Sequence, residues 1–133
     1  MTPRTDFSHV GMCVSDLERS KRFYVEALGF TRAEKHSVGP EFDRLMELEK
    51  VSLRSQFLRR GEIAIELLSF ESPRFVGPTG RRPMNHIGLT HISIRVDDVD
   101  EVASMVTDLG GMCYRDEDDD GLGRHQARFR LLH

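Results

Sequence analysis

Two short stretches of this chain resemble each other, although they lie in different halves of it. Residues 7–14 read Phe-Ser-His-Val-Gly-Met-Cys-Val, and residues 89–96 read Leu-Thr-His-Ile-Ser-Ile-Arg-Val. A histidine occupies the third position of each stretch, and each is followed by an acidic helix start and a later Leu-Gly pair. Such a repeat indicates two copies of one structural unit. We therefore expect His9 and His91 to meet at a shared centre.

The length limits how these two units are organised. A chain of 133 residues suffices for one compact domain but is too short for two independent ones. We therefore expect a single domain over 1–133. Its expected parts are a first unit at about 5–70, a linker at 71–87 that is rich in Pro and Gly, and an incomplete second unit at 88–133.

The charge balance excludes some partners. Nineteen Lys and Arg stand against 22 Asp and Glu, which gives a formal net charge of -3 and no strongly basic segment. Nucleic acid is therefore not an expected partner. No apolar run is long enough to span a bilayer, and the N-terminal residues lack the apolar core of a signal peptide. We expect no membrane association and a cytoplasmic location.

The first unit begins with a strand and a helix. Alternation over 7–14 predicts a strand with His9 opposite its aliphatic face. Ser15 and Glu18 match a capping box, in which each side chain bonds the other residue's backbone N–H, so a helix is expected to start there. The helix should end at Gly29, since glycine accepts a positive φ at a helix C-terminus.

Three further strands complete the predicted βαβββ order of this unit, at 30–35, 51–58 and 62–70. The segment 36–43 reads as a polar loop, and Arg60-Gly61 as a hairpin turn. Glu66 shares its strand face with apolar neighbours, so its carboxylate needs a partner.

The second unit repeats this pattern only in part. His91, Ser93 and Arg95 should share one face of a strand at 89–96. Asp98 should cap the next helix, which should end at Gly110. Two more strands are expected, at 112–115 and 126–132, and the fourth is absent. The predicted fold class is α+β, with two βαβββ units forming a curved, barrel-like sheet whose second unit lacks its last strand.

Three segments of the sequence resemble one protein family. They begin at His9 (His-Val-Gly-Met-Cys-Val-Ser-Asp-Leu), Gly61 (Gly-Glu-Ile-Ala-Ile-Glu-Leu-Leu) and His91 (His-Ile-Ser-Ile-Arg-Val-Asp-Asp-Val). Together with the paired units, they resemble the vicinal oxygen chelate superfamily. That group includes glyoxalase I, methylmalonyl-CoA epimerase, extradiol dioxygenases and the fosfomycin and bleomycin resistance proteins. The resemblance implies a divalent metal held between the units, with His9, Glu66 and His91 at three ligand positions.

A metal site also follows from donor chemistry. Two neutral imidazoles and one carboxylate suit Zn, Ni, Co, Mn or Fe, with open positions for substrate oxygens. The metal would act as a Lewis acid and stabilise an enediolate, formed when a base removes a proton next to a carbonyl. The alternative is that His9 and His91 face an ordinary polar cavity and Glu66 pairs with an arginine such as Arg95. Arg95 itself could hold an anionic substrate group or form a structural ion pair.

The family's fourth ligand, a glutamate in the final strand, has no counterpart in this shortened C-terminal half. Replacement ligands could come from a partner chain or from the acidic loop and the last histidines: Glu117, Asp118, Asp119, Asp120, His125 and His133. A solvated loop is the favoured reading of the acidic run, and surface positions are favoured for His36, His86 and His125. Because the missing strand leaves a sheet edge open, we expect a homodimer.

Three functions are compatible with this sequence. The leading one is a metal-dependent lyase or isomerase of the glyoxalase or epimerase type, acting on a small 2-oxo or acyl substrate. In it, Glu66 is a ligand that also acts as the catalytic base, and Arg95 is a candidate substrate contact. The second is a metal-free binding protein for an antibiotic or metabolite, which the missing carboxylate favours. An Fe(II) extradiol dioxygenase is a weaker third.

Overall fold

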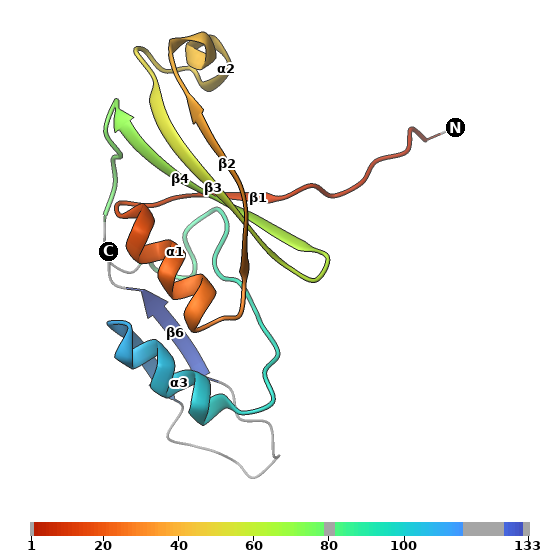
Figure 1. Ribbon diagram of the computed structural model, residues 1–133, viewed down its shortest axis with the longest axis vertical. Helices are drawn as coiled ribbons and strands as arrows, with labels where there is room; N and C mark the ends of the chain where they lie inside the picture. The colour runs from red at the N-terminus through yellow and green to blue at the C-terminus, as the bar shows by residue number, and fades with distance from the viewer. Residues whose placement is uncertain (1, 79–81, 116–126, 132–133) are drawn as a thin grey trace. The chain divides into compact units, whose positions relative to one another are not determined.

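A computed structural model describes residues 2–78, 82–115 and 127–131 of the chain (Figure 1). The chain divides into two compact units, Met1–Val76 and Gly77–His133. The single-domain organisation stays a prediction.

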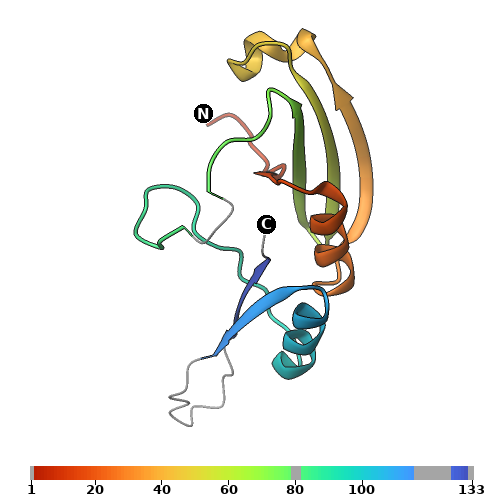
Figure 2. The same ribbon diagram turned by 90° about the vertical axis from the view of Figure 1, so that its left-hand side faces the viewer.

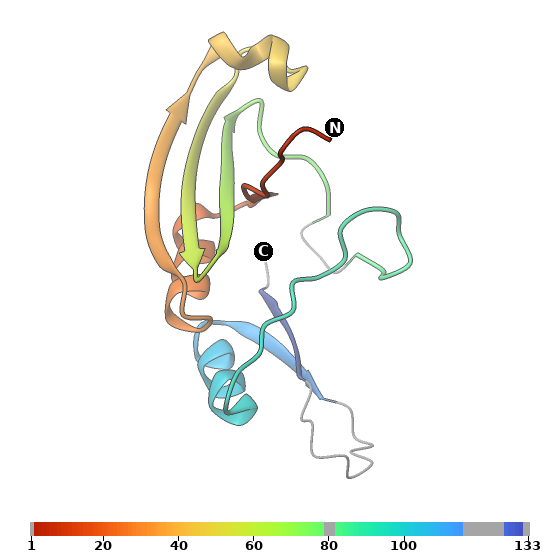
Figure 3. The same ribbon diagram turned by 90° about the vertical axis from the view of Figure 1, so that its right-hand side faces the viewer.

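The first unit is built on one four-stranded sheet. Its strands are β1 (Val10–Cys13), β2 (Thr31–Val38), β3 (Ser52–Arg60) and β4 (Ile63–Ser72), in the order β1-β4-β3-β2. Strand β1 runs parallel to β4, and the other neighbours are antiparallel. The sheet is curved and does not close on itself (Figures 2 and 3). The predicted α+β class with an incomplete curved sheet is therefore confirmed.

Helix α1 (Leu17–Glu26) follows β1, as predicted, but its cap differs from the prediction. The carboxylate of Asp16, not the hydroxyl of Ser15, accepts the backbone N–H of Arg19 at 3.0 Å. Asp16 has the extended backbone of an N-cap residue, and its negative charge complements the positive end of the helix dipole. The predicted positive φ of Gly29 is confirmed at 71°.

The core of this unit lies between α1 and the sheet. Helix α1 packs against β3 and β4. Leu58 and Leu67 are completely buried, and Phe23 of the helix is nearly so. Burying each such side chain stabilises the fold by about 1.5–3 kcal/mol. Because α1 covers one face of the sheet, the opposite face is left for other contacts.

The connection between β2 and β3 corrects a prediction. Strand β2 continues through His36 to Val38, and a 3₁₀ turn (Pro40–Phe42) and the short helix α2 (Asp43–Met46) follow it. The segment 36–43 is therefore not a plain loop. The register of β2 shifts between Arg32 and Lys35, and this irregularity obscures the period-two pattern of a strand in the sequence.

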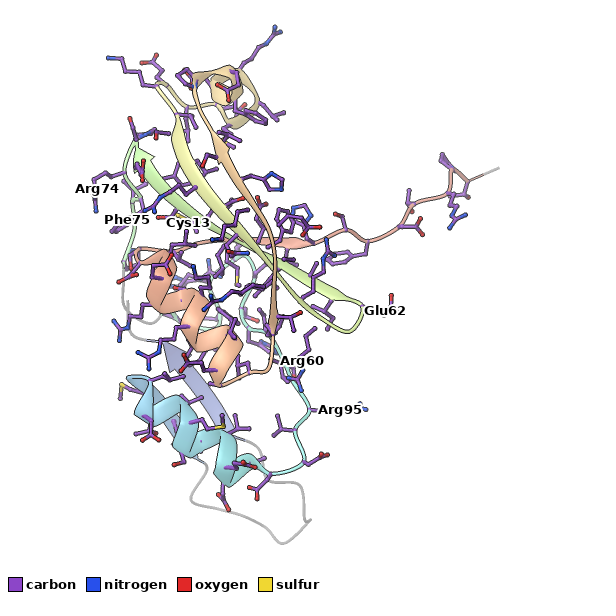
Figure 4. The ribbon with its side chains drawn as sticks, viewed as in Figure 1. Cys13, Arg60, Glu62, Arg74, Phe75 and Arg95 are labelled. Atoms are coloured by element: carbon purple, nitrogen blue, oxygen red, sulfur yellow. The ribbon has the colours of Figure 1, made fainter. Side chains whose placement is uncertain are left out.

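The hairpin between β3 and β4 confirms the predicted turn. Gly61 has a φ of 57°, which favours a residue without a Cβ atom. Beside the turn, the Arg60 guanidinium donates to the Leu28 carbonyl at 2.8 Å and so ties the hairpin to the end of α1. Figure 4 shows Arg60 and Glu62 at this end of the hairpin.

The second unit contains helix α3 (Val99–Asp108) and two antiparallel strands, β5 (Gly111–Arg115) and β6 (Ala127–Leu131). Helix α3 packs against both strands. The Asp98 cap is confirmed, because its carboxylate accepts the Glu101 N–H at 3.0 Å.

The strand predicted at 89–96 is wrong. This segment forms no strand in the structure, and Leu89 is 76% exposed. The residues alternate as in β1, but a strand also needs a hydrogen-bonded neighbour, and within the described ranges the segment pairs with none. In the first unit, β1 has that neighbour in β4.

None of the helices in the described segments is long and apolar enough to cross a membrane.

Candidate functional site

The pairing of β1 with β4 determines which face of the sheet carries Glu66. Met12 pairs with Leu67, and its sulfur accepts the hydroxyl of Tyr24 from α1 at 3.7 Å. Met12 and Leu67 therefore face the helix. Since side chains alternate along a strand, Glu66 faces the opposite way. We call this face of the sheet, opposite α1, the site face.

Cross-strand pairing places Gly11, Glu66 and Phe57 in one row across the site face. His9 lies just before β1, two residues from Gly11. Its Nε2 lies 3.2 Å from Oε2 of Glu66, and its ring packs edge-on against Phe57 at 4.8 Å. The side chains of His9 and Glu66 are 33% and 19% exposed, so solvent or a ligand can still reach the pair.

The other nitrogen of His9 is also engaged. Its Nδ1 lies 2.7 Å from Oγ of Ser8, the preceding residue. His91 repeats the arrangement, because Oγ1 of Thr90 lies 2.7 Å from its Nδ1. In each ring the hydroxyl holds Nδ1 and leaves Nε2 as the nitrogen that can contact another group.

His91 and Arg95 lie in the second unit, on the segment that is not a strand. Both are exposed, and Arg95 projects away from its own segment (Figure 4). Among the described residues, no ion pair involves Arg95, and Glu66 pairs with His9 instead. The structure thus brings together two of the predicted site residues. The meeting of His91 with His9 and Glu66 stays a prediction, as does a substrate contact by Arg95.

The pair of His9 and Glu66 supplies part of the ligand set of a divalent metal ion. One imidazole nitrogen and one carboxylate oxygen, 3.2 Å apart and partly exposed, have the chemistry of two ligands of such an ion. In the part of the chain that the structure describes, no three His, Cys, Asp or Glu side chains are grouped to hold one. His9 and Glu66 therefore fit a metal only as part of a larger set. The suggested replacement ligands lie outside the described residues: Glu117, Asp118, Asp119, Asp120, His125 and His133.

Three residues of the site face were not predicted to belong to the site. Phe57 contacts His9, His36 contacts the same ring at 5.6 Å, and Ser55 pairs with both His36 and Leu68. The sequence predicted a loop at His36, but this residue lies in strand β2. Its predicted exposure to solvent is confirmed. The register of the β3–β4 hairpin, counted back from Gly61, is a signal that could have placed Phe57 opposite Glu66.

Cys13 lies on the same face at the end of β1 (Figure 4). It is a free thiol and exposed. Partial desolvation nevertheless raises its pKa, so it remains protonated at neutral pH and is a poor nucleophile.

A family model for the glyoxalase/bleomycin resistance protein/dioxygenase superfamily matches residues 6–130. The chain belongs to this superfamily. The match confirms the resemblance to the vicinal oxygen chelate group that the sequence motifs suggested, and it covers both units. No curated protein sequence matches the chain.

Solved structures of the glyoxalase superfamily share this fold. A glyoxalase family protein from Bacillus cereus is 21% identical with a TM-score of 0.78, covering 86% of this chain and 78% of its own. One from Enterococcus faecalis is 25% identical with a TM-score of 0.63, covering 93% and 87%. The fosfomycin resistance protein FosX from Listeria monocytogenes is 20% identical with a TM-score of 0.54, covering 92% and 82%. Because one fold hosts many reactions, these likenesses establish the architecture and not the substrate.

Proposed function

We propose that this glyoxalase-superfamily protein is a metal-dependent lyase or isomerase that acts on a small 2-oxo or acyl substrate. The observation that carries the proposal is the 3.2 Å contact between His9 Nε2 and Glu66 Oε2. An imidazole and a carboxylate on one strand-paired face supply a metal ligand and a base together. In the proposal, His91 is the further ligand from the second unit.

In this proposal, Glu66, Ser8 and Phe57 have separate roles in the reaction. A divalent ion, when bound, polarises a carbonyl oxygen of the substrate. Glu66 would then remove the proton on the neighbouring carbon, since a half-buried carboxylate beside an imidazole can take up a proton and pass it on. Ser8 would keep the His9 ring oriented through Nδ1. Phe57 would exclude water from one side of the reacting carbon.

Two measurements test this proposal. We expect protein purified without chelator to contain stoichiometric metal by elemental analysis. The double variant His9→Ala with His91→Ala should lose it, and His86→Ala, which removes an exposed histidine elsewhere, should retain it. Unchanged metal content in the double variant would contradict the proposal. Glu66→Gln should slow deuterium exchange at carbon 3 of 2-oxopentanoate in D₂O by roughly 100-fold or more.

The second candidate is a metal-free binding protein. It is favoured by an aromatic ring, Phe57, in the middle of the site face. Apolar surfaces with a few polar groups suit small-molecule binding. Absence of metal even after reconstitution, together with saturable ligand binding, would favour this candidate over the enzyme.

We also propose that the protein forms a homodimer. Ile87, Leu89 and Ile92 expose large apolar side chains along one segment of the second unit. Exposed apolar groups that cluster in this way are typical of interaction surfaces. Sedimentation equilibrium should report a dimer for the wild type and a shift towards monomer for Leu89→Glu. A wild type that is monomeric at about 0.1 mM would count against it, since a dimer with micromolar affinity would be assembled there.

A further inference from the structure

Strand β2 contains one residue more than β3 where the two strands pair. Arg32 pairs with Leu58 and Lys35 pairs with Gln56, so β2 has two residues between these pairs and β3 has one. Such an insertion is a β-bulge. Because side chains alternate between the two faces of a sheet, one extra residue moves every later side chain of its strand to the opposite face. The bulge at 33–34 therefore determines which half of the following residues faces the site.

The side chain of Gln56 stabilises this bulge. It is 1% exposed, and its Nε2 donates to the carbonyl oxygens of Ala33, at 3.0 Å, and Glu34, at 3.3 Å. It also donates to the carbonyl of Phe57, the residue opposite them, at 2.8 Å. Bulge residues are displaced from the regular ladder, so their polar backbone groups need partners from elsewhere. One buried amide thus bonds both strands at the insertion.

The bulge places His36 on the site face. His36 pairs with Ser55, and its ring packs edge-on against Phe57 at 5.6 Å. Without the extra residue, the register that precedes the bulge would continue and would place Lys35 opposite Ser55. The side chain beside Phe57 would then end in an ammonium group. The insertion thus exchanges a permanently charged residue for an imidazole at this position.

The same insertion keeps positive charge off the site face in two ways. Lys35 lies on the α1 side, where its charge helps the bond from Lys21, the larger cause, to lower the pKa of Glu18. Glu34 remains on the site face and forms an ion pair with Arg59 at 3.1 Å. In the register without the bulge, Glu34 would turn to the α1 side and leave this arginine.

We propose that Gln56 is a positioning residue of the site, because the bulge that it holds places His36, and not Lys35, beside the proposed metal ligands. Phe57 connects the two places, since His9 packs edge-on against the same ring at 4.8 Å. This inference rests on the proposed function, in which a divalent ion binds there. A lysine ammonium roughly 10 Å from such an ion would weaken its binding roughly fourfold in surroundings like water.

Three variants separate this role from a general effect on stability. Gln56→Met keeps the length of the side chain and removes its donors. Arg60→Met is the matched control, because Arg60 lies on the same strand and also donates to a backbone carbonyl, that of Leu28 at 2.8 Å, but away from the bulge. Deletion of Ala33 in the Gln56→Met protein removes the extra residue without changing the partner of His36, so the amide is no longer needed.

The first measurement is the NMR contact between the rings of His36 and Phe57 in metal-free protein, with the His36 signals assigned by its alanine variant. We expect the contact in wild type and Arg60→Met, its loss in Gln56→Met, and its return when Ala33 is also deleted. A contact that Gln56→Met keeps, or that the deletion does not restore, overturns the inference. If Gln56→Met does not fold, recovery of folding and contact by the deletion supports the inference, and failure to recover overturns it.

The second measurement is metal affinity, by competition against a coloured chelator. Gln56→Met should bind a divalent ion roughly fourfold more weakly than wild type, and Lys35→Gln in that protein should restore the affinity. Lys35→Gln alone should change it little. An unchanged affinity in Gln56→Met contradicts the role of the bulge at the site. A wild type that binds no metal contradicts the proposed function, and the NMR contact still decides whether Gln56 places His36.

Discussion

Oγ of Ser8 lies 2.7 Å from Nδ1 of His9. The same contact occurs in the second unit, where Thr90 and His91 take the two places. A hydroxyl residue before each histidine is thus part of the repeat, and both units use it in the same way. Groups that hold the non-ligating nitrogen of a metal-bound histidine orient its ring and support its affinity.

Replacing both hydroxyl residues should weaken metal binding. We expect Ser8→Ala with Thr90→Val to lower the affinity about 10–100-fold, as loss of such supporting contacts does. Competition against a coloured chelator measures this. Ser52→Ala is the control, because its hydroxyl donates to the exposed Glu71 and lies away from both histidines in the sequence. Equal affinities for all three proteins would show that the contacts are incidental.

Removing a core side chain should destabilise the first unit. Leu67 is fully buried, whereas Ile63 on the same strand is 52% exposed. Leu67→Ala should lower the free energy of unfolding by about 2–5 kcal/mol, because it leaves a cavity beside α1. Ile63→Ala should cost less than about 1 kcal/mol. Urea titrations of both variants check the difference, and similar losses would contradict the burial of Leu67 beneath α1 and the exposure of Ile63.

The cap of α1 can be located by mutation. Asp16→Ala should lower the free energy of unfolding by about 1 kcal/mol, since its carboxylate holds the Arg19 N–H. Ser15→Ala should change it by less than about 0.5 kcal/mol. If Ser15→Ala lowered the free energy of unfolding more than Asp16→Ala in the same denaturant titration, the result would support the capping box expected from the sequence.

One carboxylate should make stability depend on pH. The Lys21 ammonium, which donates to Glu18 at 2.8 Å, lowers the Glu18 pKa below its ordinary value of 4.5. A lowered pKa stabilises the folded state above pH 4.5, and this stabilisation is lost as the pH falls through the folded-state value. Glu18→Gln should therefore be less stable than wild type at pH 6 and approach it at low pH. Thermal melting at several pH values tests this, and a constant difference would refute it.

Local signals in the sequence predicted much of this fold. The turn at Gly61, the positive φ of Gly29 and the Asp98 cap of α3 were confirmed, although α1 ends at Glu26, three residues before Gly29. Each depends on a backbone conformation or a hydrogen bond within a few residues, which a sequence pattern records directly. The alternation of β4 likewise predicted that Glu66 shares its strand face with apolar neighbours, and Ala64 and Leu68 do lie on that face.

Interactions between distant residues were predicted less well. His36 was assigned to a loop, because the polar strand β2 has an irregular register and lacks a clear alternation. The segment around His91 alternates as a strand does, yet pairing depends on a neighbour far along the chain. No sequence pattern pointed to Ser55, because the burial of its hydroxyl depends on residues that are distant in the sequence. Its lack of a hydrogen-bond partner among the described residues is seen only in the structure.

The parallel pairing of β1 with β4 has a consequence for how the site assembles. The two strands of a hairpin pair across a short turn. In contrast, helix α1 and strands β2 and β3 lie between β1 and β4 in the sequence. Closing so long a loop comes at an entropic cost, which contacts formed earlier must offset. We therefore expect the imidazole of His9 to meet its carboxylate late in folding, so that ligand binding reports the completed sheet and not its partly folded precursors.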